Sequence, residues 1–361
     1  MTADRVLSDR QLNRALLARQ FLLERSALSL VETIERVGGL QTQYAPSGYI
    51  GLWSRLRNFE RDALTTALER RQVIQGTLLR STIHMVSARD YPLFLAAVKQ
   101  ARQEWWRRVR KEFGALDMRP AIAAFREHLR QGPRRAIELK ELLASHGYPP
   151  LAWNGMAVWV DMVRVPPSGT WDQRRADLYA LADTWLRATP ATEAAGLEHV
   201  VRRYLGGFGP ATVREIADWA GIPHARLAPA LALLSLRRFR DEEGRELLDL
   251  PRAPLPDAET PAPVRFLPTW DATLLVHARR TQILPERYRP LVFNVKTPHS
   301  KPTFLVDGFV AGCWRYEGGT VKLEPFERLP QRVRANVDEE ARRLAAFHAD
   351  SKKYNRRPSY G

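Results

Sequence analysis

Apolar residues recur at helical spacing near the start of the chain, between residues 9 and 36. Ser8 and Ser29 stand before two of these stretches as candidate N-cap residues. Two consecutive glycines, Gly38 and Gly39, end the second stretch. The pattern therefore predicts two helices followed by a sharp change of direction.

A third helical pattern fits residues 60–71. Residues 77–87 alternate between apolar and polar positions and carry several β-branched side chains, which predicts a strand or one arm of a hairpin. Helices followed by a hairpin are typical of a winged helix. We therefore assign residues 1–118 to a first winged-helix unit and the helices that follow it.

The same order recurs twice. Residues 119–190 hold two helical stretches and the run MAVWVDMVRV, which is either a strand pair or a helix that leads into a strand. Residues 191–250 hold three helical stretches and a two-stranded wing that turns at Glu243 and Gly244. Within them, GPATVREIADWAGIPHARLAPALALL has the features of a helix-turn-helix. The sequence thus predicts three winged-helix units in tandem.

The C-terminal part has a different pattern. A proline-rich stretch over residues 251–263 indicates a linker. Residues 264–332 alternate apolar and polar side chains between glycine turns, which predicts a small antiparallel β-barrel. A helix and a basic tail complete the chain over residues 333–361. The predicted fold is mainly α with β.

The charge of the chain indicates a class of partner. Lys and Arg number 56 against 40 Asp and Glu, so the formal net charge is 56 − 40 = +16, and the sequence pI is near 10.4. Such a chain should attract polyanions, above all nucleic acid. The alternative is an arginine-rich composition whose charged faces are merely solvated.

Other features of the composition exclude several classes of site. The single Cys313 cannot form an intrachain disulfide or a cysteine zinc cluster, and the eight histidines are scattered. We therefore expect no metal and no cofactor. No apolar run approaches the roughly 18 residues that span a bilayer, and the N-terminus lacks a signal-peptide core. These features predict a cytoplasmic protein without a membrane segment.

Two amide side chains, Gln41 and Gln43, flank Thr42 directly after the second predicted helix. Amides cannot ionise, so they can bind or orient a water molecule but cannot act as strong bases. From the residues alone, a structural role is favoured, in which the two amides cap or bridge the helix-turn-helix of the first unit. Their meaning depends on the rest of the chain.

Several phrases of the sequence resemble the winged-helix DNA glycosylases of the AlkZ and YcaQ type. They are GGLQTQYAP, RSTIHMVSARDY, GFGPATVREIADWAGI, RFLPTWDATLLVH and FLVDGFVAGCW, and they span residues 11 to about 347. The resemblance implies three winged-helix units in a C shape around a basic channel, with a β-barrel appended. It also implies that Gln41 and Gln43 are the catalytic positions. One branch of the family has Asp at the second position, so this chain is closer to the AlkZ branch.

The expected reaction suits uncharged catalytic side chains. A guanine alkylated at N7 is cationic and leaves without a general acid, and cleavage passes through an oxocarbenium-like sugar. Amide oxygens can stabilise that cation and orient the water that attacks it. The resemblance therefore implies a monofunctional glycosylase for N7-alkylguanine-type bases, which also unhooks interstrand crosslinks.

Further residues are candidates for contact with DNA. His84 and Thr82 belong to one of the shared phrases and are candidates for contact with the lesion, although a lone histidine on a strand is more often structural. Backbone contacts are expected from two basic segments, whose members are Lys99, Arg102, Arg107, Arg108, Lys296, His299 and Lys301. Trp105 and Trp106 in the first segment are equally compatible with a helix core. We assign Asp271 and Asp307 to turns.

The expected partner is double-stranded DNA with alkylated bases or crosslinks, bound by a monomer associated with the nucleoid. The alternative is a winged-helix protein that binds DNA without catalysis, such as a transcription regulator. A nuclease is disfavoured because no cluster of Asp, Glu and His has metal-ligand spacing.

Overall fold

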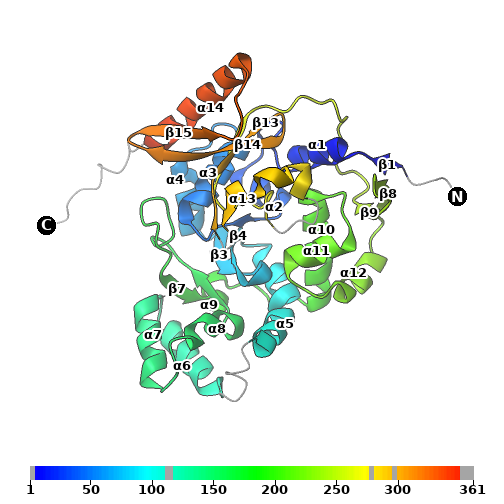
Figure 1. Cartoon of the computed structure of the whole chain (residues 1–361). Helices are drawn as coiled ribbons and strands as arrows, with labels where there is room; N and C mark the ends of the chain where they lie inside the picture. The colour runs from blue at the N-terminus through cyan, green and yellow to red at the C-terminus, as the bar shows by residue number, and fades with distance from the viewer. Residues whose placement is uncertain (1–4, 110–116, 276–279, 295–298, 350–361) are drawn as a thin grey trace.

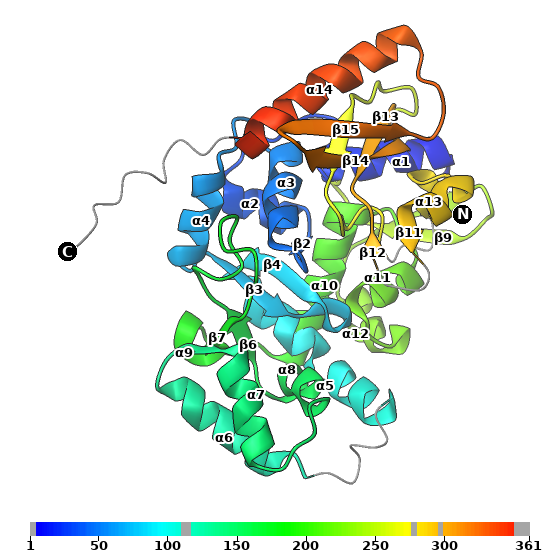
Figure 2. The same ribbon diagram turned by 60° about the vertical axis from the view of Figure 1, so that its left-hand side comes forward.

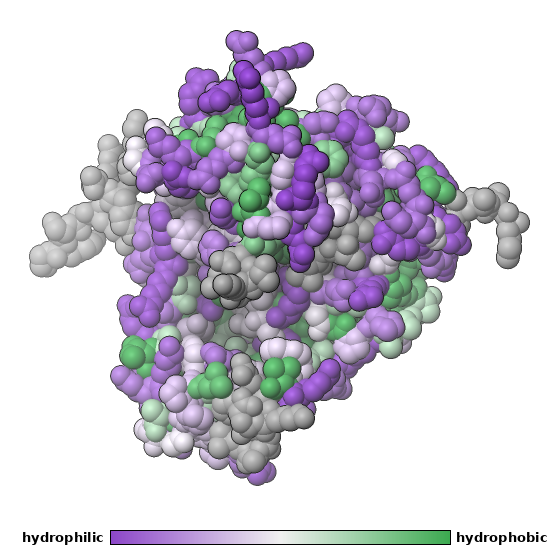
Figure 3. Space-filling model, viewed as in Figure 1, coloured by the Kyte–Doolittle hydropathy of each residue, from purple (hydrophilic) through white to green (hydrophobic). Residues whose placement is uncertain are grey.

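The computed structural model describes residues 5–109, 117–275, 280–294 and 299–349. In Figure 1 most of the N-terminal elements lie near the centre and α6 to α9 lie at the lower left. Helices α10 to α12 lie at the right, and the strands β13 to β15 lie with the long helix α14 at the top. The face in Figure 3 is mostly hydrophilic, with hydrophobic side chains in a narrow strip and scattered spots. No helix in the described part of the chain is long and apolar enough to cross a membrane.

The N-terminal elements begin as predicted. They are α1 (Asp9–Arg19), α2 (Leu30–Arg36), β2 (Leu40–Gln41), α3 (Ala45–Arg55), α4 (Arg61–Glu69), β3 (Val73–Thr77) and β4 (Ile83–Ser87). Ser8 caps α1, and Ser29 forms a reciprocal capping box with Glu32 at the start of α2. Gly38 and Gly39 have φ of +79° and +83°, which only glycine adopts without strain, and they turn the chain into β2.

The next residues form two groups of helices with short strands. The first group is α5 (Tyr91–Val109), α6 (Arg119–Arg130), β5 (Arg134–Arg135), α7 (Ala136–Ser145), α8 (Ala152–Trp159), β6 (Met162–Arg164), β7 (Leu178–Leu181) and α9 (Ala182–Leu186). The second is α10 (Glu193–Phe208), α11 (Val213–Ala220), α12 (Ala228–Ala232), β8 (Arg237–Asp241) and β9 (Glu246–Asp249), with β1 (Val6–Leu7) parallel to β8. The run MAVWVDMVRV is a helix that leads into a strand, and the β8–β9 hairpin turns at Gly244 as expected.

A six-stranded sheet joins the N-terminal elements to the first of these two groups. Its strand order is β2-β4-β3-β6-β7-β5, so β3 pairs with β4 on one side and with β6 on the other. The second pairing joins Gln75 to Arg164 and Gly76 to Val163. The boundary expected at residue 118 therefore lies inside a segment that one sheet spans, and the divisions at 118, 190, 250, 263 and 332 remain predictions.

The C-terminal strands form an open sheet. The elements are β10 (Arg265–Leu267), α13 (Arg289–Val292), β11 (Phe293–Asn294), β12 (His299–Ser300), β13 (Thr303–Val306), β14 (Phe309–Glu317), β15 (Thr320–Pro325) and α14 (Gln331–Ala349). Within the described residues the order β10-β13-β14-β15 closes no barrel, contrary to the expectation. The reason lies in the packing: Phe266 and Phe304 share a core with residues of α3 and α14, so helices cover the apolar face that barrel closure would otherwise bury.

Candidate functional site

Gln41 and Gln43 lie where an edge strand meets a helix. Gln41 ends β2 and is paired with His84 of β4, and the amide of Thr42 donates to the carbonyl of Ile83 at 2.9 Å. Two residues after Gln43, α3 begins. This extended entry lets the side chains of two residues that are two positions apart converge, which a regular helix would forbid. Gln41 is 7% exposed, whereas Gln43 is exposed.

Arg80 fixes the direction of both amides. Its Nη2 donates to Oε1 of Gln41 at 2.9 Å, and Nε2 of Gln41 donates to Oε1 of Gln43. A guanidinium can only donate, so Gln41 must turn its oxygen to Arg80 and its NH₂ group to Gln43. The carbonyl oxygen of Gln41 is therefore already engaged, and Gln43 is the member of the pair that faces solvent.

The loop that presents Arg80 has an unusual backbone. Arg80 and Ser81 have φ of +51° and +59°, a region that costs a residue other than glycine about 1–2 kcal/mol. The amide of Leu78 donates to the carbonyl of Thr82 at 2.9 Å, which closes the loop between β3 and β4. A Cβ on Gly221 would come within 3.0 Å of the Arg80 backbone, so the turn after α11 packs directly on this loop.

The guanidinium of Arg80 is largely shielded from solvent. Its Nη1 donates to the carbonyl of Trp219 in α11, and burial lowers the pKa of Arg80 to about 10. The side chain therefore stays cationic at neutral pH. A fixed cation behind Gln41 polarises the chain of hydrogen bonds that ends at Gln43.

His84 and Thr82 are held inside this loop. His84 is 3% exposed, and burial, followed by the charge of Arg80, lowers its pKa to about 3. The ring is therefore neutral, and Nδ1 donates to the carbonyl of Thr82 at 3.1 Å. The hydroxyl of Thr82 donates to the carbonyl of Leu79 at 3.0 Å. Both side chains support the loop that carries Arg80; His84 is buried, whereas Thr82 is partly exposed.

The first basic segment divides into buried and exposed residues. Arg102 is 4% exposed and donates to main-chain carbonyls of Thr77 and Ala157, and Lys99 pairs with Asp161 at 2.7 Å. Arg102 is therefore occupied inside the protein, whereas the side chain of Lys99 is paired but still 41% exposed.

The end of α5 is different. Arg107 and Arg108 are exposed there, with the guanidinium of Arg107 over the ring of Trp159 at 4.8 Å. Trp105 is 45% exposed, whereas Trp106 belongs to a core.

The second basic segment is described in part. Lys296 lies outside the described residues, and His299 and Lys301 are exposed. The ring of His299 packs edge-on against Trp270 at 5.7 Å.

Asp271 and Asp307 form ion pairs within the protein. Asp271 makes a buried two-bond contact with Arg55, both distances being 2.9 Å, and Asp307 pairs with Arg14 at 2.5 Å. These pairs tie the C-terminal segments to the N-terminal helices, which supports a structural role for both carboxylates.

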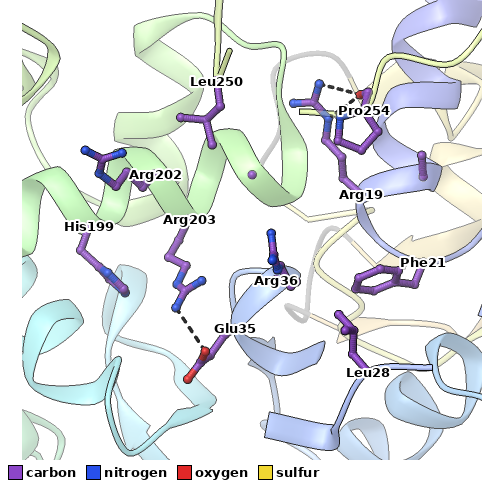
Figure 4. Close-up of a pocket in the computed structure, with 12 residues that line it drawn as sticks. Arg19, Phe21, Leu28, Glu35, Arg36, His199, Arg202, Arg203, Leu250 and Pro254 are labelled. Carbon is purple, nitrogen blue, oxygen red and sulfur yellow. Dashed lines mark hydrogen bonds and ion pairs between the residues drawn. The ribbon is translucent and has the colours of Figure 1, made fainter. Parts of the chain in front are cut away.

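Neither of two cavities in the described part of the chain includes Gln41 or Gln43 in its lining. The larger, about 510 Å³, lies between α1, α2 and α10 (Figure 4). Its arginines are largely paired, since Arg203 contacts Asp90 at 2.8 Å and Glu35 at 3.6 Å. The cations are balanced by carboxylates, so this cavity offers little net attraction to an anion. The smaller cavity, about 230 Å³, begins at the residue after Gln43.

Comparison with known proteins identifies the family. The sequence model of the AlkZ-like DNA glycosylases matches residues 34–347, a stretch that includes the Gln41–Gln43 pair, Arg80 and the C-terminal sheet. The chain belongs to this family. It is therefore a DNA glycosylase, an enzyme that acts on DNA, and the resemblance seen in the sequence is confirmed.

A solved structure shares the fold of this chain. The chain is similar to Streptomyces sahachiroi DNA glycosylase AlkZ with a TM-score of 0.76 and 18% sequence identity, over 95% of this chain and 97% of that one. At this identity the likeness shows a shared mixed α/β fold. No curated protein sequence matches the chain.

Arg80 is the residue of this AlkZ-like site that the sequence did not reveal. It opens the phrase RSTIHMVSARDY, so the signal was a charged residue at the start of a shared segment. Neither periodicity nor spacing brings residue 80 next to residue 41. Only the pairing of β2 with β4 and the unusual backbone of the loop do so.

Proposed function

We propose that the chain hydrolyses the N-glycosidic bond of cationic alkylated bases, of the N7-alkylguanine type, in double-stranded DNA. The observation that carries this proposal is the amide pair of Gln41 and Gln43, held in one direction by Arg80 in a member of the AlkZ-like family. Gln43 is exposed and lines neither cavity, which supports a site that a lesion approaches without full extrusion from the duplex.

The proposed step needs no general acid. The bond between C1′ of the sugar and N9 of the base breaks, and its electron pair neutralises the positive charge of the alkylated ring. The sugar becomes an oxocarbenium-like cation, water adds at C1′, and a proton is released to solvent. The products are an abasic site and a neutral alkylated base.

The two glutamines have different roles in this proposal. Oε1 of Gln43 keeps one lone pair beyond the bond that it accepts from Gln41, so it can accept a hydrogen bond from the attacking water or stabilise the developing sugar cation. Gln41, with its oxygen held by Arg80, positions Gln43. This differs from the sequence-based picture, in which both amide oxygens point at the cation.

We infer that the three helix-and-strand units act as winged-helix modules on the duplex. The order α2-β2-α3-α4-β3-β4 and the order α10-α11-α12-β8-β9 both place a hairpin after helices, which supports this role.

The net charge of +16 favours binding to the phosphate backbone. Exposed Arg107, Arg108, His299 and Lys301 are the predicted backbone contacts that remain accessible. That the enzyme acts as a monomer remains a prediction.

An excision assay tests the proposal. Duplex DNA with a single 7-methylguanine is incubated with excess enzyme, and abasic sites are detected by alkaline cleavage. We expect release of the base by the wild type and a loss of about 100-fold or more in single-turnover rate for Gln43→Ala. Gln331→Ala, an exposed glutamine at the start of α14, is the matched control and should retain the wild-type rate.

The same assay separates the alternatives. A wild type that binds the duplex but releases no base, from 7-methylguanine or from a nitrogen-mustard crosslink, would favour a DNA-binding role without this activity. Excision that survives Gln43→Ala would instead place the catalytic group elsewhere. Unhooking of the crosslink on a denaturing gel is the separate test of that substrate.

A further inference from the structure

The smaller cavity adjoins the proposed catalytic pair. It lies between the start of α3, the strand β14 and the end of α14; Figure 2 shows α3 next to the C-terminal sheet and α14. We call it the Tyr44 pocket and define it by six of its lining residues: Tyr44, Ser47, Arg174, Trp314, Tyr316 and His348. Tyr44 follows Gln43 directly, so a group attached to a base at Gln43 is within reach of the pocket.

Aromatic rings form one wall of the Tyr44 pocket. The rings of Tyr316 and His348 stack with centroids 4.2 Å apart and an interplanar angle of 17°, and Trp314 meets His348 edge-on at 6.0 Å. Tyr44 is 41% exposed and Tyr316 is 36% exposed. Accessible flat rings of this kind provide stacking surfaces for a planar ligand.

Two polar atoms in the pocket have no hydrogen-bond partner among the described residues. They are Oγ of Ser47, a residue only 3% exposed, and Nε2 of His348. Buried polar atoms in native proteins are normally paired, so an unpaired hydroxyl on a residue that lines a cavity is available to a ligand or to an ordered water. The pocket therefore combines an aromatic wall, on which any flat ring can stack, with polar atoms that a substituted ring can use in addition.

The charges around the pocket exclude a cationic ligand. Arg174 donates to the hydroxyl of Tyr44 at 3.0 Å. Burial, together with the charges of Arg174 and Arg61, lowers the pKa of His348 to about 4, so the imidazole is neutral at pH 7. A ring that itself bears a positive charge, such as an N7-alkylated guanine, is disfavoured beside these arginines. An uncharged ring meets no such repulsion from the arginines.

We propose that the Tyr44 pocket binds the uncharged aromatic substituent that a bulky adduct carries on N7, while the guanine itself stays outside at Gln43. This inference rests on the proposed function. The volume of about 230 Å³ is below the roughly 300–1,000 Å³ of pockets for drug-sized ligands, which suits one substituted ring. The enzyme would then discriminate among adducts by the substituent on the alkylated N7 atom.

The experiment compares two adducts by binding, so that it does not depend on catalysis. Duplexes carry either 7-benzylguanine or 7-methylguanine on a 2′-fluoro sugar that resists cleavage, and Kd is measured for each. We expect the wild type to bind the benzyl duplex about tenfold more tightly, from stacking of one ring. Tyr316→Ala should remove that preference, and Tyr316→Phe, which keeps the ring, should retain it.

The outcomes separate this inference from the proposed function. Equal Kd values of the wild type for the two duplexes, or a benzyl preference that survives both Tyr316→Ala and Tyr44→Ala, would overturn the pocket assignment. Excision of 7-methylguanine from a duplex with ordinary deoxyribose, without any preference for the benzyl duplex in binding, would leave the glycosylase proposal intact. A benzyl preference that depends on Tyr316, without excision of either base, would support the pocket and refute the catalytic proposal.

Discussion

A single cationic side chain distinguishes two glutamines that are equivalent in the sequence. Arg80 takes the oxygen of Gln41, whereas the oxygen of Gln43 accepts one bond from Gln41 and keeps a lone pair. In the proposed mechanism Gln41 acts only through Gln43, so its loss and the loss of Arg80 should have the same effect. This equivalence can be tested directly.

We predict that Arg80→Ala lowers the single-turnover excision rate of 7-methylguanine about 100-fold, because a displaced catalytic group costs about that much. Adding Gln41→Ala should lower the rate little further, because both changes release Gln43. The affinity for intact DNA should change much less than the rate. Arg334→Ala on α14, an exposed arginine, is the control. Additive losses in the double variant would show that the two residues act separately.

The buried His84 predicts how stability depends on pH. Its pKa is about 3 in the folded protein and about 6.5 when unfolded, so the unfolded chain binds more protons between these values. The free energy of unfolding is therefore fully present above pH 6.5 and falls as the pH drops toward 3, by up to about 1.4 kcal/mol per pH unit. Denaturant titrations at pH 7.5 and 5 should show a smaller loss for His84→Gln than for the wild type. Equal losses would contradict this role.

At the scale of elements, helices with one apolar face were predictable and a helix buried on all sides was not. Every residue of α3 is buried, so it has no polar stripe, and Gly48 and Gly51 lower its helical propensity. The capped helices α1 and α2 carried local signals and were predicted correctly. The pairing of β3 with β6 and the contact of Arg80 with Gln41 depend on long-range packing, which no local pattern encodes.

The ion pair between Arg55 in α3 and Asp271 after β10 anchors this helix to the C-terminal half. Both side chains are almost fully buried. We predict that Asp271→Ala lowers the free energy of unfolding by about 3–5 kcal/mol, because a buried guanidinium is left without its partner. Asp338→Ala, which removes an exposed partner of Arg334, should cost less than about 1 kcal/mol. Similar losses in thermal melts of the two variants would contradict the assignment.

For the whole molecule, the excess of 16 positive charges should govern binding to undamaged DNA. We predict a linear fall of log K with log salt, and a slope that becomes shallower by about 0.9 for each phosphate contact removed. Arg107→Ala with Arg108→Ala should flatten the slope, whereas Arg334→Ala with Arg342→Ala on α14 should not. Slopes measured by fluorescence anisotropy that are the same for both pairs would show that the end of α5 does not contact the backbone.

The shared sheet limits how this chain can be divided or recombined. Separating the first 118 residues from the rest would expose the unpaired edge of β3, and the remaining piece would expose β6. Free strand edges recruit other strands, so each piece expressed alone should self-associate. A chimaera that replaces only one side of this sheet must therefore also rebuild the pairing of β3 with β6.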